Sequence, residues 1–197
     1  MTTLFANPTS PFVRLVRMAL YEKGLAETVE TRFVDAWADD PAFLDANPAG
    51  RVPAFVTADG ARLTEAMLIL RHLDALRPEP ALFGDDAALS RAGLAVGVFD
   101  AAVAVIIGRK SNPDFDTHLV GRKRYRTMRD GLARLDAALP EAAGKGLDLA
   151  AIAAITALDY LVFRFPDEDW RGIAPRLAAF RDAHADRPSV VETVPRG

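Results

Sequence analysis

The stretch VPAFVTADGARLTEAMLIL, residues 52–70, decides the fold. It holds two short runs of β-forming residues, 53–57 and 61–63, joined by the turn Ala58-Asp59-Gly60, which supplies the positive φ of a tight hairpin. The second run leads directly into an apolar segment with helical spacing, and we expect Thr64 to cap this helix. The stretch therefore predicts strand, strand and helix in succession.

The residues before this stretch predict a strand–helix–strand unit. The apolar run Thr2 to Ala6 ends at Asn7-Pro8, where proline removes a backbone donor, so a strand is expected to end there. Ser10 followed by Pro11 is typical of a helix start, and helical spacing continues to Gly24. The alternating run TVETRFV, residues 28–34, predicts a second strand. The order β-α-β and then β-β-α is that of a thioredoxin-like α/β domain.

The pattern changes after residue 77. Pro78, Pro80 and Gly84 interrupt regular structure, and only alanine-rich helical patterns follow. We expect helices over 86–109, 113–139, 148–165 and 173–185, and an extended tail over 188–197. The sequence thus predicts a thioredoxin-like domain at 1–77, a linker at 78–86 and an all-helical domain at 87–197.

Composition excludes several classes of protein. Half of the 197 residues are hydrophobic, which is enough for buried cores, and the net charge of −3 gives no overall attraction to nucleic acid or to an anionic membrane. The absence of cysteine excludes disulfides and thiolate metal sites. No secretory signal is visible, and the apolar run at 94–107, broken by Gly97 and Asp100, is too short to span a bilayer. We expect a cytoplasmic protein in which this run is a buried helix.

The sequence contains no strong motif for binding a metal or a nucleic acid. The three histidines, His72, His118 and His184, lie too far apart for a local zinc signature, so we predict no metal. The segment GRKRYRTMR, residues 121–129, is basic, but acidic residues follow it and the whole chain is acidic. We interpret it as a solvated or inter-domain helix face and expect neither a nucleic-acid nor a membrane partner.

Ser10 lies at the mouth of a helix N-terminus. Free backbone N–H groups and the helix dipole stabilise an anion there, so the Ser10 hydroxyl is suited to donate to a thiolate and keep it ionised near neutral pH. The alternative is that Ser10 only caps the first helix.

Two further segments suit a peptide-like ligand. In NPAGRVP, residues 47–53, a cis Val52–Pro53 bond would expose the N–H and C=O of Val52 to an extended ligand, whereas a trans bond would merely start a strand. In LTEA, residues 63–66, free N–H groups suit a ligand carboxylate and Glu65 is placed to accept from an amino group. Alternatively, Glu65 is only a favourable first-turn acid.

Taken in order, TSPFVR, NPAGRVP, LTEAMLIL and the helix from Asp148 resemble the motifs of bacterial glutathione transferases, and the chain length matches. The resemblance is to a poorly defined subgroup with serine in the first motif. It implies a thioredoxin-like glutathione-binding domain followed by an all-helical domain. It also implies that Ser10 is the catalytic residue facing the glutathione sulfur, with Thr9 as a neighbouring hydroxyl and Phe12 lining the site.

The same resemblance assigns the rest of the glutathione site. Val52 and Pro53 correspond to the valine before a cis-proline, and Arg51 to a residue beside the glycyl part. Glu65 and Ala66 correspond to the pair that grips the γ-glutamyl end.

The chain departs from the family pattern at two points. Ala66 replaces a serine whose hydroxyl contacts the ligand carboxylate; losing one such hydrogen bond costs roughly 0.5–1.5 kcal/mol, which the backbone N–H and Glu65 can offset. Ala151 replaces an aspartate that commonly completes a capping box with residue 148, which bears on folding. Pro8-Thr9-Ser10 stands where a maleylacetoacetate-isomerase-like enzyme carries Ser-Ser-Cys, which argues against that activity.

The resemblance implies that the protein is a glutathione transferase that acts in detoxification. It would conjugate glutathione, its co-substrate, to a small apolar electrophile held between the domains, against a wall made by Phe12, Phe99, Val103 and Ile106. The alternative, which Ala66 favours, is a non-enzymatic protein-interaction module of the same fold. The apolar helix after the linker, together with the resemblance, predicts a homodimer.

Overall fold

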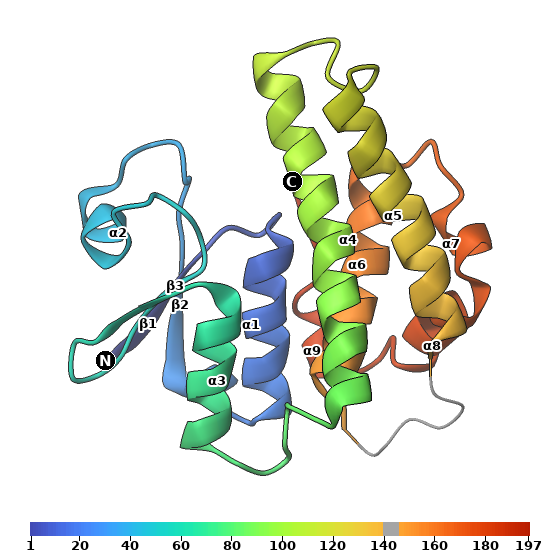
Figure 1. Ribbon diagram of the computed structural model, residues 1–197. Coiled ribbons are helices and arrows are strands. Elements are labelled where there is room, and N and C mark those ends of the chain that lie inside the picture. The colour runs from blue at the N-terminus through green and yellow to red at the C-terminus, as the bar shows by residue number, and fades with distance from the viewer. Residues whose placement is uncertain (140–145) are drawn as a thin grey trace. The chain divides into compact units, whose positions relative to one another are not determined.

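The computed structural model describes residues 1–139 and 146–197, which form two compact units (Figure 1). Unit 1 comprises Met1–Leu82 and Asp186–Gly197, and unit 2 comprises Phe83–Ala185. The C-terminal segment therefore packs with unit 1, whereas the predicted helical domain at 87–197 included it. The reason is a set of hydrogen bonds to the first helix, described below.

Unit 1 contains a four-stranded mixed sheet in the order β2-β1-β3-β4. β1 (Thr2–Ala6) pairs in parallel with β2 (Val29–Phe33) and antiparallel with β3 (Ala54–Val56). β3 pairs antiparallel with β4 (Arg62–Thr64). Gly60 makes the hairpin turn with φ +88°, in the left-handed region that favours glycine. This is the predicted thioredoxin-like order.

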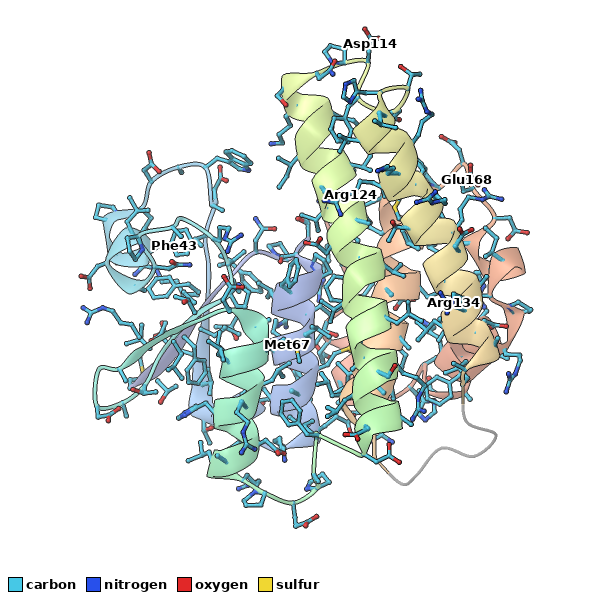
Figure 2. The ribbon with its side chains drawn as sticks, in the orientation of Figure 1. Phe43, Met67, Asp114, Arg124, Arg134 and Glu168 are labelled. Carbon is cyan, nitrogen blue, oxygen red and sulfur yellow. The ribbon has the colours of Figure 1, made fainter. Side chains whose placement is uncertain are left out.

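Helices cover both faces of this sheet. α1 (Pro11–Glu22) and α3 (Ala66–Leu76) pack against each other on one face (Figure 1). On the other face lies the short α2 (Pro41–Ala46), whose Phe43 ring packs 5.9 Å from that of Phe5 (Figure 2). A 3-10 turn, η1 (Ala26–Thr28), leads into β2. Leu4 and Phe5 are successive in β1 and both buried, which shows that apolar side chains line both sides of this central strand.

Two local predictions in unit 1 are wrong, and one short helix was not expected. Thr64 is the last residue of β4 and not a cap, because the strand continues one residue further and Glu65 takes the N-cap position of α3. The tail is not wholly extended, since Pro188–Val191 forms the short helix α9, with proline at the first position, where its missing N–H leaves no hydrogen bond unmade. α2 was not predicted, although Asp40 caps it and Pro41 starts it, as Ser10 and Pro11 do for α1.

A buried lysine fastens the chain that follows α3. Lys23 Nζ donates to Asp74 Oδ1 at 2.5 Å and to the carbonyls of Arg77 and Pro80 at 2.7 and 2.5 Å. Asp74 Oδ1 also accepts from the Leu82 N–H at 2.9 Å. Burial alone would raise the pKa of Asp74, but the hydrogen bonds from Lys23 and Leu82 and the charge of Lys23 outweigh it and hold the pKa below its ordinary value. One ion pair thus ties the ends of α1 and α3 to the start of the inter-unit chain.

The described part of unit 2 is all helical. It contains α4 (Asp86–Ser111), α5 (Leu119–Ala137), α6 (Leu149–Arg164), α7 (Trp170–Ile173) and α8 (Pro175–Ala183). α4 packs against both α5 and α6 (Figure 1). Asp148 caps α6 by accepting from the Ala151 N–H at 2.8 Å, so the cap forms without the second acidic residue.

Two predicted helices of unit 2 differ from the observed ones. The helix expected from residue 113 begins only at Leu119, because the preceding residues form turns in which Phe115 packs on two glycines. A Cβ at Gly121 would lie 1.9 Å from the Phe115 carbonyl oxygen, so only glycine allows this approach. The helix expected over 173–185 is observed as α8, which starts two residues later at Pro175, and the short α7 before it was not expected.

α4 is a buried core helix. By length and composition it is long and apolar enough to span a bilayer, so the expectation that its apolar run is too short fails. The expectation of a buried helix is confirmed, since Val98, Phe99 and Val105 are fully buried and the helix packs against α5 and α6.

Candidate functional site

Asn7 organises the loop that carries Thr9 and Ser10 to the start of α1. Its Oδ1 accepts both from the Thr9 N–H at 3.0 Å and from the Thr9 hydroxyl at 2.8 Å, so the Thr9 proton is engaged. Ser10 Oγ accepts from the Val13 N–H at 3.3 Å, and its own proton meets no acceptor in residues 1–139 and 146–197. Of the two hydroxyls, Ser10 is therefore the one with a proton to donate.

Capping and anion binding by Ser10 are compatible. The cap uses a lone pair of Oγ, whereas donation to a thiolate uses the proton on the same oxygen. The first turn of α1 carries no acidic residue, so nothing in it opposes the helix dipole. Ser10 and Phe12 are both half-buried, which leaves this turn partly accessible.

Asn47 organises the loop before Val52 by hydrogen bonds, as Asn7 organises the loop before Ser10. Its Oδ1 accepts from the Ala49 N–H at 3.1 Å, and its Nδ2 donates to the Arg51 carbonyl at 2.6 Å. Both asparagines precede a proline and accept from the N–H two residues on, which is the geometry of an Asx turn. The prediction did not include these two asparagines, although the repeated Asn-Pro pair was a signal that could have found them.

The Val52–Pro53 peptide bond is cis, and Pro53 is buried directly before β3. The N–H and C=O of Val52 have no backbone partner within the described ranges 1–139 and 146–197. The Val52 backbone therefore has one donor and one acceptor available for an extended ligand.

Glu65 holds an unusual backbone conformation at the start of α3, with φ 64° and ψ 120°. A non-glycine residue in such a region costs of order 1–3 kcal/mol and persists only where its surroundings impose it, often at functional sites. The N–H groups of Ala66 and Met67 begin the helix and have no helical acceptor. Ala66 itself is buried and brings a methyl group but no hydroxyl. The turn thus offers backbone donors beside one carboxylate.

Arg51 and Glu65 are brought together. Arg51 Nη2 lies 2.6 Å from Glu65 Oε1, with the two side chains 71% and 62% exposed. An exposed pair of this kind is worth about 0–1 kcal/mol, so a charged ligand can replace either partner. The resemblance assigns the two residues to opposite ends of glutathione, and serving both ends requires this pair to separate.

Not all residues of the predicted apolar wall are exposed enough to contact an electrophile. Phe99 is fully buried in the core of α4, whereas Val103 and Ile106 on the same helix are half-buried. Within the described part of the chain, no group of three or more His, Cys, Asp or Glu side chains is placed to hold a metal ion.

Comparison with known proteins identifies a family over most of the chain. Residues 4–81 match the model of the glutathione S-transferase N-terminal domain, and residues 121–183 match that of the C-terminal domain. The chain is 28% identical over 201 aligned positions to the uncharacterised GST-like protein YibF of Escherichia coli K12, with 98% of each protein covered.

Solved structures give the same result. A glutathione S-transferase from Methylobacterium radiotolerans, in complex with glutathione sulfonate, is 30% identical with a TM-score of 0.89, over 100% of this chain and 95% of that one. A glutathione transferase family member from Pseudomonas fluorescens Pf-5, with bound glutathione, is 32% identical with a TM-score of 0.83, over 100% of both chains. The chain therefore belongs to the glutathione S-transferase family.

Proposed function

We propose that the protein is a glutathione transferase that ionises the glutathione thiol at Ser10 and adds the thiolate to a small apolar electrophile. The observation that carries the proposal is the uncommitted Ser10 proton at the N-terminus of α1, beside a Thr9 proton that is already engaged. Relatives with bound glutathione and glutathione sulfonate support the ligand.

Binding uses four groups of unit 1. The Val52 N–H and C=O pair with the peptide backbone of glutathione, and the free N–H groups of Ala66 and Met67 take the γ-glutamyl carboxylate. Glu65 accepts from the γ-glutamyl ammonium, and Arg51, once released from Glu65, attracts the glycyl carboxylate.

Ionisation and attack follow at the start of α1. The helix dipole and the Ser10 O–H stabilise the thiolate, which lowers the thiol pKa, and the thiol proton passes to solvent. The sulfur lone pair then forms the carbon–sulfur bond. In a substitution the leaving group departs with its electron pair, and in an addition the neighbouring carbon takes a proton from water.

The test separates the two roles of Ser10. Ser10→Ala should lose transferase activity together with about 0.5–2 kcal/mol of stability, because both the cap and the thiolate donor disappear. Ser10→Asn should keep most of the stability, since its side-chain oxygen caps the helix, and should lose activity because no hydroxyl is restored. Activity is measured with glutathione and a panel of electrophiles.

Thr9→Val is the matched control. It removes the neighbouring hydroxyl, whose proton already bonds to Asn7, and should leave the thiol pKa unchanged. The proposal is refuted if Ser10→Asn keeps full turnover. It is also refuted if the wild-type protein accelerates the reaction of no electrophile and shows no thermal shift with millimolar glutathione.

A second candidate function is a non-enzymatic interaction module, favoured by the missing hydroxyl at Ala66. Calorimetric titration of glutathione into the pure protein distinguishes the two candidates. Binding supports the enzyme, and complete absence of binding supports the module.

We also propose that the protein is a cytoplasmic homodimer that acts in detoxification. Two neighbouring apolar residues of α3 support the dimer, because a second copy of the chain would cover them: Met67 (Figure 2) is 36% exposed and Leu68 is 63% exposed. Light scattering that gives the monomer mass at micromolar concentration would contradict the dimer.

A further inference from the structure

The last residues of the chain run antiparallel along the whole length of α1. At one end, Arg187 Nη2 and Ser189 Oγ donate to the buried Glu22 carboxylate at 2.7 and 2.5 Å. At the other end, the Arg196 N–H donates to the Pro8 carbonyl at 3.4 Å, directly before Thr9. The segment therefore reaches from the last turn of α1 to the loop that presents Ser10.

A buried chain of polar groups joins this segment to the N-terminal part of α1. Arg14 Nε donates to Thr193 Oγ1 at 3.3 Å, and Thr193 Oγ1 donates to the Ser189 carbonyl at 2.6 Å. Arg14, Ser189 and Thr193 are 3%, 1% and 2% exposed. Since a buried polar group that loses its hydrogen bond carries the full desolvation penalty, this chain holds its members in one arrangement.

Arg14 also belongs to the first turn of α1. Its N–H donates to the Ser10 carbonyl at 3.0 Å, so the residue that Thr193 holds is hydrogen-bonded to the backbone of Ser10. The cap itself, from Val13 N–H to Ser10 Oγ, is long at 3.3 Å and cannot alone fix the direction of the hydroxyl. Thr193 and Arg196 add contacts from outside α1, to this first turn and to the loop before it.

We infer that residues 187–196 form a splint that holds the first turn of α1, and that Thr193 is a positioning residue for Ser10. The inference rests on the proposed function. The splint acts through Arg14 on the Ser10 backbone and through Pro8 on the preceding loop, and it keeps the Ser10 proton directed at the glutathione sulfur.

The experiment exchanges groups of equal size. Thr193→Val removes the buried hydroxyl without changing the volume, Thr193→Ser restores it, and Val191→Thr makes the reverse exchange at a 46% exposed position of the same segment. For each full-length variant, the pKa of bound glutathione is followed by the ultraviolet absorbance of the thiolate, with kcat, the glutathione Kd and amide hydrogen exchange at residues 10–14.

Thr193→Val should raise the pKa of the bound thiol and lower kcat by about tenfold to a hundredfold at neutral pH, because small displacements at a reacting group have effects of this size. The kcat of this variant should return toward the wild-type value at alkaline pH. The Kd of glutathione, measured at a pH well below the thiol pKa where the ligand binds as the neutral thiol, should stay within about twofold, because the binding groups at Val52 and Glu65 are untouched. Exchange at residues 10–14 should quicken more than elsewhere in unit 1. Thr193→Ser should restore the wild-type pKa, and Val191→Thr should match the wild type.

Two failures are distinguishable. If the wild type lowers the thiol pKa but Thr193→Val leaves both this pKa and the exchange at residues 10–14 unchanged, the splint is refuted and the proposed function stands. If the wild type neither binds glutathione nor lowers its pKa, the proposed function falls and the role of Thr193 in catalysis falls with it. Should Thr193→Val not fold, removal of residues 194–197, which deletes the hydrogen bond from the Arg196 N–H to the Pro8 carbonyl, must produce the same alkaline shift, and an unchanged pKa refutes the inference.

Discussion

Removing the Asp74 carboxylate should destabilise unit 1 strongly. The side chain of Lys23 is fully buried and that of Asp74 is 13% exposed, so the charge of Lys23 has little access to water. Breaking a buried pair by removing one partner costs about 3–5 kcal/mol. Because Lys23 keeps the carbonyls of Arg77 and Pro80, we expect Asp74→Ala to lose about 3 kcal/mol, which lowers Tm by about 6–12 °C for a chain of this size.

Asp74→Asn isolates the charge. The amide keeps an oxygen for Lys23 and for the Leu82 N–H, so only the ionic part of the interaction disappears, and we expect a loss of about 2 kcal/mol. Asp45→Asn is the matched control, because Asp45 pairs with Arg62 at 2.6 Å but is 72% exposed, and such pairs contribute about 0–1 kcal/mol.

The effect should depend on pH with a definite sign. The pKa of Asp74 is lowered in the folded protein, so its stabilising effect is complete above the ordinary aspartate pKa of about 3.9 and is lost as pH falls through the lowered value. Urea unfolding followed by circular dichroism should therefore show a constant gap between wild type and Asp74→Asn from about pH 5 to neutrality, and a closing gap below about pH 4. A loss under 1 kcal/mol for Asp74→Ala, or a gap that widens in acid, would refute this reasoning.

Three other substitutions test the site and the helical unit. Ala66→Ser supplies the hydroxyl usual in the family and should tighten glutathione binding by roughly twofold to tenfold in calorimetry; unchanged affinity would show that the ligand carboxylate lies elsewhere. Glu65→Gly relieves the positive φ and should gain about 1 kcal/mol in urea unfolding while weakening glutathione binding, and a loss of stability would contradict the strain. Gly121→Ala should lose about 1–3 kcal/mol because its methyl meets the Phe115 carbonyl, whereas the control Gly97→Ala, with nothing within 4 Å, should gain about 0.5–1 kcal/mol; equal effects would argue against the close approach.

Local signals predicted much of the fold. Ser10-Pro11 and Asp148 start helices where expected, because a cap and its partners lie within three residues of each other. The order of strands and helices along the chain was enough to predict the thioredoxin-like domain, because each strand of the sheet pairs with another strand that the sequence pattern also predicts.

The remaining features join residues that are distant in sequence. Arg14 and Thr193 are separated by 179 positions, and Lys23 and Asp74 by 51, so no spacing rule brings them together. The pairing of Arg51 with Glu65 also depends on how β4 meets α3, which periodicity does not describe. The capping role of Ser10 was predicted from the sequence, but its contrast with Thr9 required the position of the Asn7 oxygen.

The division of the chain, in which unit 1 takes its last piece from the C-terminus, has a consequence for synthesis on the ribosome. α1 emerges early, yet Ser189 and Thr193 reach Glu22 and Arg14 only after the whole of unit 2 has been translated. At about 5–20 residues per second this interval is on the order of ten seconds or more. A nascent chain stalled within unit 2 should therefore expose α1 to proteases, and this helix should become protected only when the completed chain is released.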